Sequence, residues 1–128
     1  MSRPSFIKSR YNSFRFAFKG MSAVFRYEPN MHLHVLASLA VLVMAYWFEV
    51  TRVEWCLLIL CIGIVWMAEI FNTAIETLTD LVSPERNPLA GKTKDMAAGA
   101  VLMAALMAAA VGLIIFIPYW AAYVNVAL

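Results

Sequence analysis

Residues 53–81 read VEWCLLILCIGIVWMAEIFNTAIETLTDL, and this segment decides the fold. Its first half is apolar from Trp55 to Ala68, as expected of a helix that crosses a bilayer. Its second half carries polar residues at helical spacing, namely Glu69, Asn72, Glu76 and Asp80, called the polar row below. An ionised carboxylate in hydrocarbon costs at least about 3 kcal/mol, so the polar row indicates a site with a chemical or assembly role.

The composition indicates an integral membrane protein. The 128 residues are 63% hydrophobic and 14% charged, whereas soluble domains average about 25% charged residues. Apolar stretches before and after residues 53–81 also approach or exceed the ~20 residues that span a bilayer. We predict one all-α membrane domain over residues 1–128, with an amphipathic surface helix followed by three transmembrane helices. The expected helices cover residues 5–27, 31–48, 53–81 and 92–118.

The charge distribution predicts the orientation. Six of the ten Lys and Arg residues precede the first acidic residue, Glu28. By the positive-inside rule, the N-terminus and the loop 82–92 are cytoplasmic, and the C-terminus lies outside. We expect no cleaved signal peptide, because the first long apolar stretch follows a charged segment and lacks a small-residue cleavage pattern. Aromatic residues gather at the expected outer interface, namely Tyr46, Trp47, Trp55, Tyr119, Trp120 and Tyr123.

The N-terminal helix has an apolar stripe beside a basic face. Between Ile7 and Phe25, apolar residues recur at alternating steps of four and three. Such a helix is expected to lie on the cytoplasmic leaflet with its apolar face in the headgroup boundary. Packing on the protein's own core is the alternative, and both can hold together. Pro29 ends this helix and leaves Glu28 at a corner.

Small residues between Ala97 and Gly112 predict close helix contact in the third span. Three helices form a thin bundle, so we expect oligomerisation to bury the polar row. Cys56 and Cys61 point to different faces of one helix and lack a nearby zinc-ligand pattern, which favours inert packing residues.

The polar row forms one stripe. With Glu69 at zero, the other three residues fall at about −60°, −20° and +20°, along roughly 16 Å of helix. Lys94 and Asp95 begin the third span at the same expected level. Carboxylates, an amide and an ammonium group together suit phosphoryl transfer at a membrane surface. Two alternatives remain open: a conduction path in a small transporter or channel, and a seam that fixes oligomer register.

Within the phosphoryl-transfer hypothesis, each residue type suggests a role. Glu28 and Glu76 supply the hard oxygen ligands that Mg²⁺ prefers. Glu69 is the deepest carboxylate and the candidate general base for a lipid hydroxyl. Gly91-Lys92-Thr93 is not a P-loop, because the first glycine would have to stand at Arg86 and no strand precedes the motif.

A second apparent signal is a histidine pair. His32 and His34 lie about 200° apart on a helix, so joint metal chelation is not expected. Polar residues near the inner interface are the default interpretation for both.

The polar motifs resemble a known family. Glu69-Ile-Phe-Asn72-Thr-Ala-Ile-Glu76, continuing to Asp80-Leu, and Lys94-Asp95-Met-Ala-Ala-Gly99-Ala-Val are similar to signatures of the small bacterial diacylglycerol kinase and undecaprenol kinase family. The resemblance runs from about residue 14 to 118. It implies a homotrimer in the bacterial inner (cytoplasmic) membrane that transfers the γ-phosphoryl group of ATP, with Mg²⁺, to a lipid alcohol. No nucleic acid partner is expected.

The resemblance also implies site residues. Glu69 is then the catalytic base, Glu28 and Glu76 are metal and nucleotide ligands, and Lys94 with Asp95 belongs to the nucleotide site. Supporting or substrate-binding positions are Arg10, Asn72, Asp80 and Gly99. Phe16 stands where family members place a nucleotide-contacting tyrosine.

The resemblance also bears on the acceptor. Asn30-Met31 with His34, Glu54-Trp55 and the segment 112–118 look more like the undecaprenol kinase branch, so undecaprenol is favoured over diacylglycerol.

Overall fold

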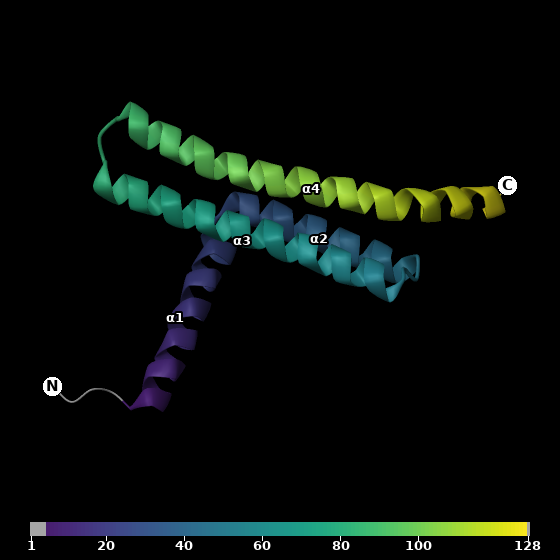
Figure 1. The fold of residues 1–128 in the computed structure, drawn as a ribbon, viewed down its shortest axis with the longest axis horizontal. Coiled ribbons are helices and arrows are strands. Elements are labelled where there is room, and N and C mark those ends of the chain that lie inside the picture. Colours follow the sequence, from purple (N-terminus) through teal and green to yellow (C-terminus); the bar gives the residue numbers. More distant parts are fainter. Residues whose placement is uncertain (1–4, 128) are drawn as a thin grey trace.

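The computed structural model describes residues 5–127, and all regular structure in that range is α-helical. The four helices are α1 (Phe6–Tyr27), α2 (Pro29–Trp47), α3 (Arg52–Val82) and α4 (Pro88–Ala127). Figure 1 shows α2, α3 and α4 running alongside one another, while α1 projects steeply from them. The last three helices are long and apolar enough to cross a membrane. The predicted helical membrane fold is therefore confirmed.

A sharp elbow at Glu28 and Pro29 separates α1 from α2. Glu28 has extended backbone angles (φ −95°, ψ 113°), and Pro29 occupies the start of α2, where its missing N–H costs no hydrogen bond. The backbone N–H of Glu28 donates to the carbonyl of Val24 at 3.0 Å. Across the elbow, Nε2 of His32 donates to the carbonyl oxygen of Phe25 at 2.9 Å.

Within this chain, α1 is covered very little. Val24 is its one buried residue, and aromatic residues of its apolar stripe such as Phe14 and Phe18 are more than 60% exposed. The contacts of α1 with α2 and α3 lie near its C-terminal end (Figure 1). The chain's own core therefore does not cover the apolar stripe of α1. The cytoplasmic leaflet of the membrane remains the predicted cover.

The turn that joins α2 to α3 contacts α4 through polar and aromatic side chains. Thr51 and Glu54 form a reciprocal capping box at the start of α3, and the hydroxyl of Tyr119 donates to Oε2 of Glu54 at 2.8 Å. Four α4 rings surround Phe48, with centroids 6.0–6.4 Å away: Phe116, Tyr119, Trp120 and Tyr123. Beneath them lies a small core of Ala45, Val50, Leu58 and Ile115.

Helix α4 is longer than the expected segment 92–118 at both ends. Oδ1 of Asn87 accepts from the backbone N–H of Leu89 at 2.9 Å, and Pro88 follows as the first helical residue. This Asn-Pro pair therefore starts the helix. At the other end α4 continues past Pro118, where the contacts of Tyr119 and its aromatic neighbours hold the last turns against the bundle.

Small residues mediate the contact between α3 and α4, as the sequence suggested. Ala97 and Ala104, seven residues apart on one face of α4, are buried. Alanine at these positions allows the two backbones to approach closely. Gly99 lies on an open face, where an added Cβ would meet no atom of another helix within 4 Å.

Candidate active site

The polar row of α3 runs from a buried end to an exposed end. Glu69 is 1% exposed and Asn72 is 5% exposed, whereas Glu76 is half-buried and Asp80 is exposed. The expectation that a single three-helix bundle is too thin to bury these groups is wrong for Glu69 and Asn72. Side chains of α2 and α4 cover them, so their burial needs no second copy.

Two buried oxygens in this row have no partner among residues 5–127. They are Oε2 of Glu69 and Oδ1 of Asn72. The amide nitrogen of Asn72 donates to Oε1 of Glu76 at 3.2 Å, which links the two residues one turn apart. An unpaired buried polar group costs about 1–3 kcal/mol. Such groups in a folded protein call for a specific role, and a reacting substrate is one that fits.

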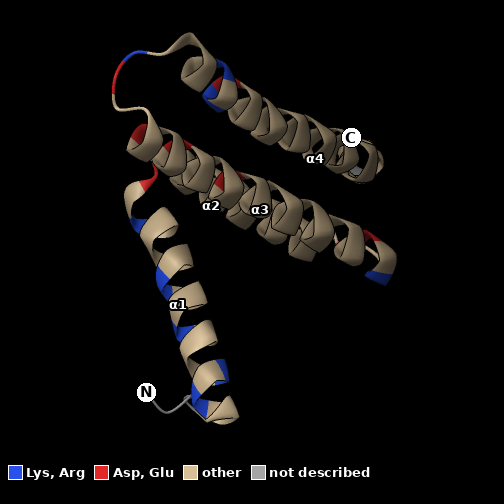
Figure 2. Cartoon of the chain, turned by 60° about the vertical axis from the view of Figure 1, so that its left-hand side comes forward, with Lys and Arg blue, Asp and Glu red and all other residues tan. Residues whose placement is uncertain are grey.

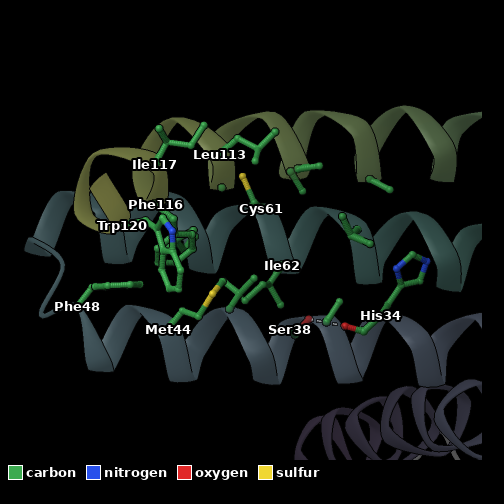
Figure 3. Close-up of a pocket in the computed structure, with 18 of the residues that line it drawn as sticks. His34, Ser38, Met44, Phe48, Cys61, Ile62, Leu113, Phe116, Ile117 and Trp120 are labelled. Atoms are coloured by element: carbon green, nitrogen blue, oxygen red, sulfur yellow. Dashed lines mark hydrogen bonds between the residues drawn. The ribbon is translucent and has the colours of Figure 1, made fainter. Parts of the chain in front are cut away.

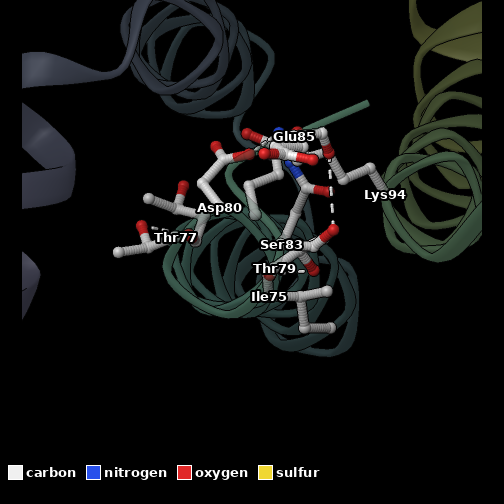
Figure 4. Close-up of polar contacts among 10 residues, drawn as sticks. Ile75, Thr77, Thr79, Asp80, Ser83, Glu85 and Lys94 are labelled. Atoms are coloured by element: carbon white, nitrogen blue, oxygen red, sulfur yellow. Dashed lines mark hydrogen bonds and ion pairs between the residues drawn. The ribbon is translucent and has the colours of Figure 1, made fainter. Parts of the chain in front are cut away.

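An ion pair joins α3 to α4 at the end of the bundle that carries the loop 83–87. Nζ of Lys94 lies 2.5 Å from Oδ1 of Asp80 (Figure 4). Both side chains are partly exposed, at 34% and 64%, and pairs of this kind contribute about 0–1 kcal/mol. Asp95 is exposed beside them. A weak, accessible pair leaves the Lys94 ammonium available to an incoming phosphate.

Two hollows meet on α3 between α2 and α4. The smaller, called the polar cavity, has a volume of about 270 Å³ and is lined by Asn30, His34, Glu69 and Asn72 together with apolar residues of α2 and α4. The larger, called the apolar groove, has a volume of about 760 Å³ and extends toward Phe48 and Trp120 (Figure 3). His34 and Ala105 line both. The two hollows are therefore neighbours with a shared wall.

The predicted residues of α1 are not brought to this site within one chain. Arg10 and Phe16 are exposed on the part of α1 that projects away from the bundle, and the Arg10 guanidinium lies over the Phe6 ring at 5.7 Å from its centroid. Figure 2 shows the basic residues spaced along α1 and an acidic residue at its elbow. That acidic residue, Glu28, is half-buried at the start of α2.

The donor set suits a nucleotide-bound divalent cation better than a free-standing metal site. Within residues 5–127, no three His, Cys, Asp or Glu side chains are grouped closely enough to hold an ion. Mg²⁺ is commonly bound through one or two carboxylates and the phosphates of a substrate. The candidate ligands Glu28 and Glu76 match this pattern, and the unpaired Oδ1 of Asn72 adds a hard oxygen.

Sequence reasoning missed a second polar row, on α2. Asn30, His34 and Ser38 follow one another at steps of four and therefore share one face of the helix. Asn30 and His34 line the polar cavity, and Oγ of Ser38 accepts from Nε1 of Trp66 at 3.1 Å. The four-residue spacing was the available signal. His34 was weighed as a partner of His32 and, with Asn30, as a mark of the acceptor branch, and neither comparison includes Ser38.

Trp66 ties three helices together one turn before Glu69. Its indole donates to Ser38 on α2, and the ring of Phe25 from α1 meets it edge-on at 5.1 Å between centroids. We expect Ser38→Ala to lower the free energy of unfolding by about 1–3 kcal/mol, because the indole N–H then lacks its acceptor. Denaturant titration in detergent micelles measures this. Ser22→Ala, on the exposed face of α1, is the matched control, and equal stability of the two variants would contradict the expectation.

The sequence of this chain is similar to those of known lipid kinases. The model of the prokaryotic diacylglycerol kinase family matches residues 15–116. The undecaprenol kinase of Bacillus subtilis (strain 168) is 39% identical over 108 residues, covering 84% of this chain and 88% of that protein. The diacylglycerol kinase of Escherichia coli (strain K12) is 34% identical over 93 residues, covering 73% and 76%.

A third relative is longer. The diacylglycerol kinase of Synechocystis is 36% identical over 107 residues, which cover 83% of this chain and 61% of that protein. Three apolar helices, a buried acidic and amide row, and a match over most of the chain agree on one family. The chain therefore belongs to the prokaryotic diacylglycerol kinase family and is a membrane-embedded lipid kinase.

Proposed function

We propose that this lipid kinase transfers the γ-phosphoryl group of ATP to the primary hydroxyl of a membrane lipid alcohol, with undecaprenol as the preferred acceptor and diacylglycerol as the second. The observation that carries the proposal is the unpaired, buried Oε2 of Glu69 in a polar cavity that adjoins an apolar groove. A lipid alcohol has this same division between a small polar group and a long apolar chain.

In the proposed reaction, Glu69 acts on the acceptor hydroxyl. Its carboxylate takes the hydroxyl proton while the alcohol oxygen bonds to the γ-phosphorus and the bond from that phosphorus to the β,γ-bridging oxygen breaks. ADP leaves with the bond's electron pair, and the product is a lipid phosphate. General bases of this kind contribute about 10²–10⁴ in rate. The Asn72 amide, which bonds to Glu76, holds the next residue of the row in place.

The nucleotide phosphates are expected at the exposed end of the polar row. Glu28 and Glu76 would hold Mg²⁺, which neutralises charge on the β- and γ-phosphates when bound. Lys94 exchanges Asp80 for a phosphate oxygen, and Asp95 lies beside it. We place this end in the cytoplasm of a bacterium, at its inner membrane, because the basic α1 belongs on the inner side by the positive-inside rule.

We further propose a homotrimer in which α1 of one copy approaches the polar row of another. Support comes from Arg10 and Phe16, which are exposed on the helix that projects from the bundle, and from the uncovered apolar stripe of α1. Native mass spectrometry of the active protein in detergent is expected to give three times the chain mass. Full activity in a preparation that contains monomer alone would contradict the shared site.

The apolar groove and the name of one relative favour a polyprenol acceptor over a diacyl lipid. The apolar groove offers side chains along α2, α3 and α4, and the similar Bacillus subtilis protein is named an undecaprenol kinase. A conduction path is not supported, because the groove beyond His34 is lined by apolar side chains such as Val41, Met44 and Leu58.

Acceptor competition tests the proposed reaction. Purified protein receives γ-labelled ATP and Mg²⁺ with undecaprenol and diacylglycerol in the same mixed micelles. We expect both lipids to be labelled, with the larger kcat/KM for undecaprenol. Preference for diacylglycerol would overturn the substrate choice alone, and absence of label from both lipids would overturn the kinase reaction as drawn.

A further inference from the structure

His34 occupies the boundary between the two hollows. It lies on α2, five residues after Pro29, and is half-buried. It lines the polar cavity together with Glu69 and Asn72, and it also lines the apolar groove together with Ser38 and Val41. In Figure 3 its ring points from α2 toward the groove.

The backbone carbonyl of His34 is hydrogen-bonded, whereas its ring makes no hydrogen bond within residues 5–127. Oγ of Ser38 donates to the carbonyl oxygen of His34 at 2.6 Å and accepts from the indole of Trp66. This chain of bonds attaches the His34 turn of α2 to α3 one turn from Glu69. By contrast, among residues 5–127 no hydrogen bond to the imidazole of His34 was found, although the exposed His32 bonds to Phe25.

The shared wall is where the polar head of a lipid alcohol must lie if its chain occupies the groove and its hydroxyl reaches Glu69. A neutral imidazole has one N–H donor and one acceptor nitrogen. The N–H can donate to the oxygen of the acceptor hydroxyl, while the hydroxyl proton points to the unpaired carboxylate oxygen of Glu69. A metal role is not supported, because Mg²⁺ prefers oxygen ligands and no three-ligand group occurs in the described residues.

The geometry points to His34 as the residue that binds and positions the acceptor hydroxyl opposite Glu69. This inference rests on the proposed kinase reaction. It assigns to the second polar row a role separate from nucleotide binding: Asn30 and His34 form the α2 wall of the acceptor site, and Ser38 holds that wall against Trp66.

The test compares His34→Met, which fills similar space without a donor, with His34→Gln, which keeps an N–H. Initial rates are measured against undecaprenol at saturating ATP and against ATP at saturating undecaprenol. We expect His34→Met to raise the acceptor KM by about 10-fold, the upper range for loss of one neutral hydrogen bond, with the ATP KM unchanged. His34→Gln should restore much of the acceptor KM.

His32→Met is the matched control, because His32 is exposed and lines neither hollow. It should leave the acceptor KM within about twofold of wild type, which is less than the loss of one hydrogen bond to the substrate would cause. An unchanged acceptor KM in His34→Met, or an equal rise in His32→Met, would overturn the inference while wild-type activity upholds the kinase reaction. If His34→Met fails to fold, His34→Ala replaces it in the same assay, and a rise in its ATP KM equal to the rise in its acceptor KM would overturn the inference, since that pattern marks a packing role. No labelled lipid from the wild-type protein would instead overturn the proposed function.

Discussion

Glu69→Gln is expected to lower kcat for lipid phosphorylation by about 10³-fold, within the range attributed to general-base catalysis. Glutamine keeps the size of the side chain and its hydrogen-bonding capacity in the buried position but cannot take the hydroxyl proton. Because Glu69 is 1% exposed and its Oε2 has no partner in the described chain, the variant removes no bond from that oxygen to the protein. Initial rates with labelled ATP measure the loss, and size-exclusion chromatography checks the fold.

Glu85→Gln is the matched control for this substitution. Glu85 is exposed in the loop between α3 and α4, and its side chain makes none of the described polar contacts. It should retain the wild-type rate. A Glu69→Gln protein that turns over as fast as Glu85→Gln would exclude Glu69 as the base.

Glu76→Gln is expected to lower activity by about 100-fold. Removal of a side chain that hydrogen-bonds to a metal ligand typically costs about 10–100-fold, and loss of a ligand itself should cost at least the upper value. The substitution keeps an oxygen near the Asn72 amide but removes the charge proposed to hold Mg²⁺. The diagnostic change is a rise in the Mg²⁺ concentration needed for half-maximal rate, measured by titration at fixed ATP.

The same titration on Glu85→Gln provides the reference curve. An unaltered Mg²⁺ requirement in Glu76→Gln, together with a loss of oligomer, would instead assign Glu76 to assembly. That result would revive the interpretation of the polar row as a seam between helices.

Long apolar runs and a proline were enough to predict most of the fold. The runs around residues 31–48, 53–81 and 92–118 correspond to α2, α3 and α4, and Pro29 marks the elbow. The C-terminal end of α4 was not predicted correctly. Its continuation past Pro118 depends on contacts with Phe48 and Glu54, which are distant in the sequence. Local sequence carries no direct record of such long-range contacts.

One part of the candidate site could be predicted from the sequence and the other could not. The polar row of α3 is conspicuous because charges stand in an apolar segment, and its gradient from buried Glu69 to exposed Asp80 follows from position along one helix. The α2 row is less conspicuous, since Asn30, His34 and Ser38 are uncharged or weakly basic. Which face of α2 meets α3 depends on packing, including the Trp66–Ser38 bond, and spacing alone did not decide it.

We propose that phosphoryl transfer to a lipid hydroxyl takes place in the polar cavity around Glu69. The most direct measurement is the amount of label that moves from γ-labelled ATP into chloroform-extractable undecaprenyl phosphate, for wild-type and Glu69→Gln protein side by side. We predict label in the lipid with wild-type protein and about 10³-fold less with Glu69→Gln. Equal labelling by both proteins, or wild-type label released only as inorganic phosphate, would contradict it.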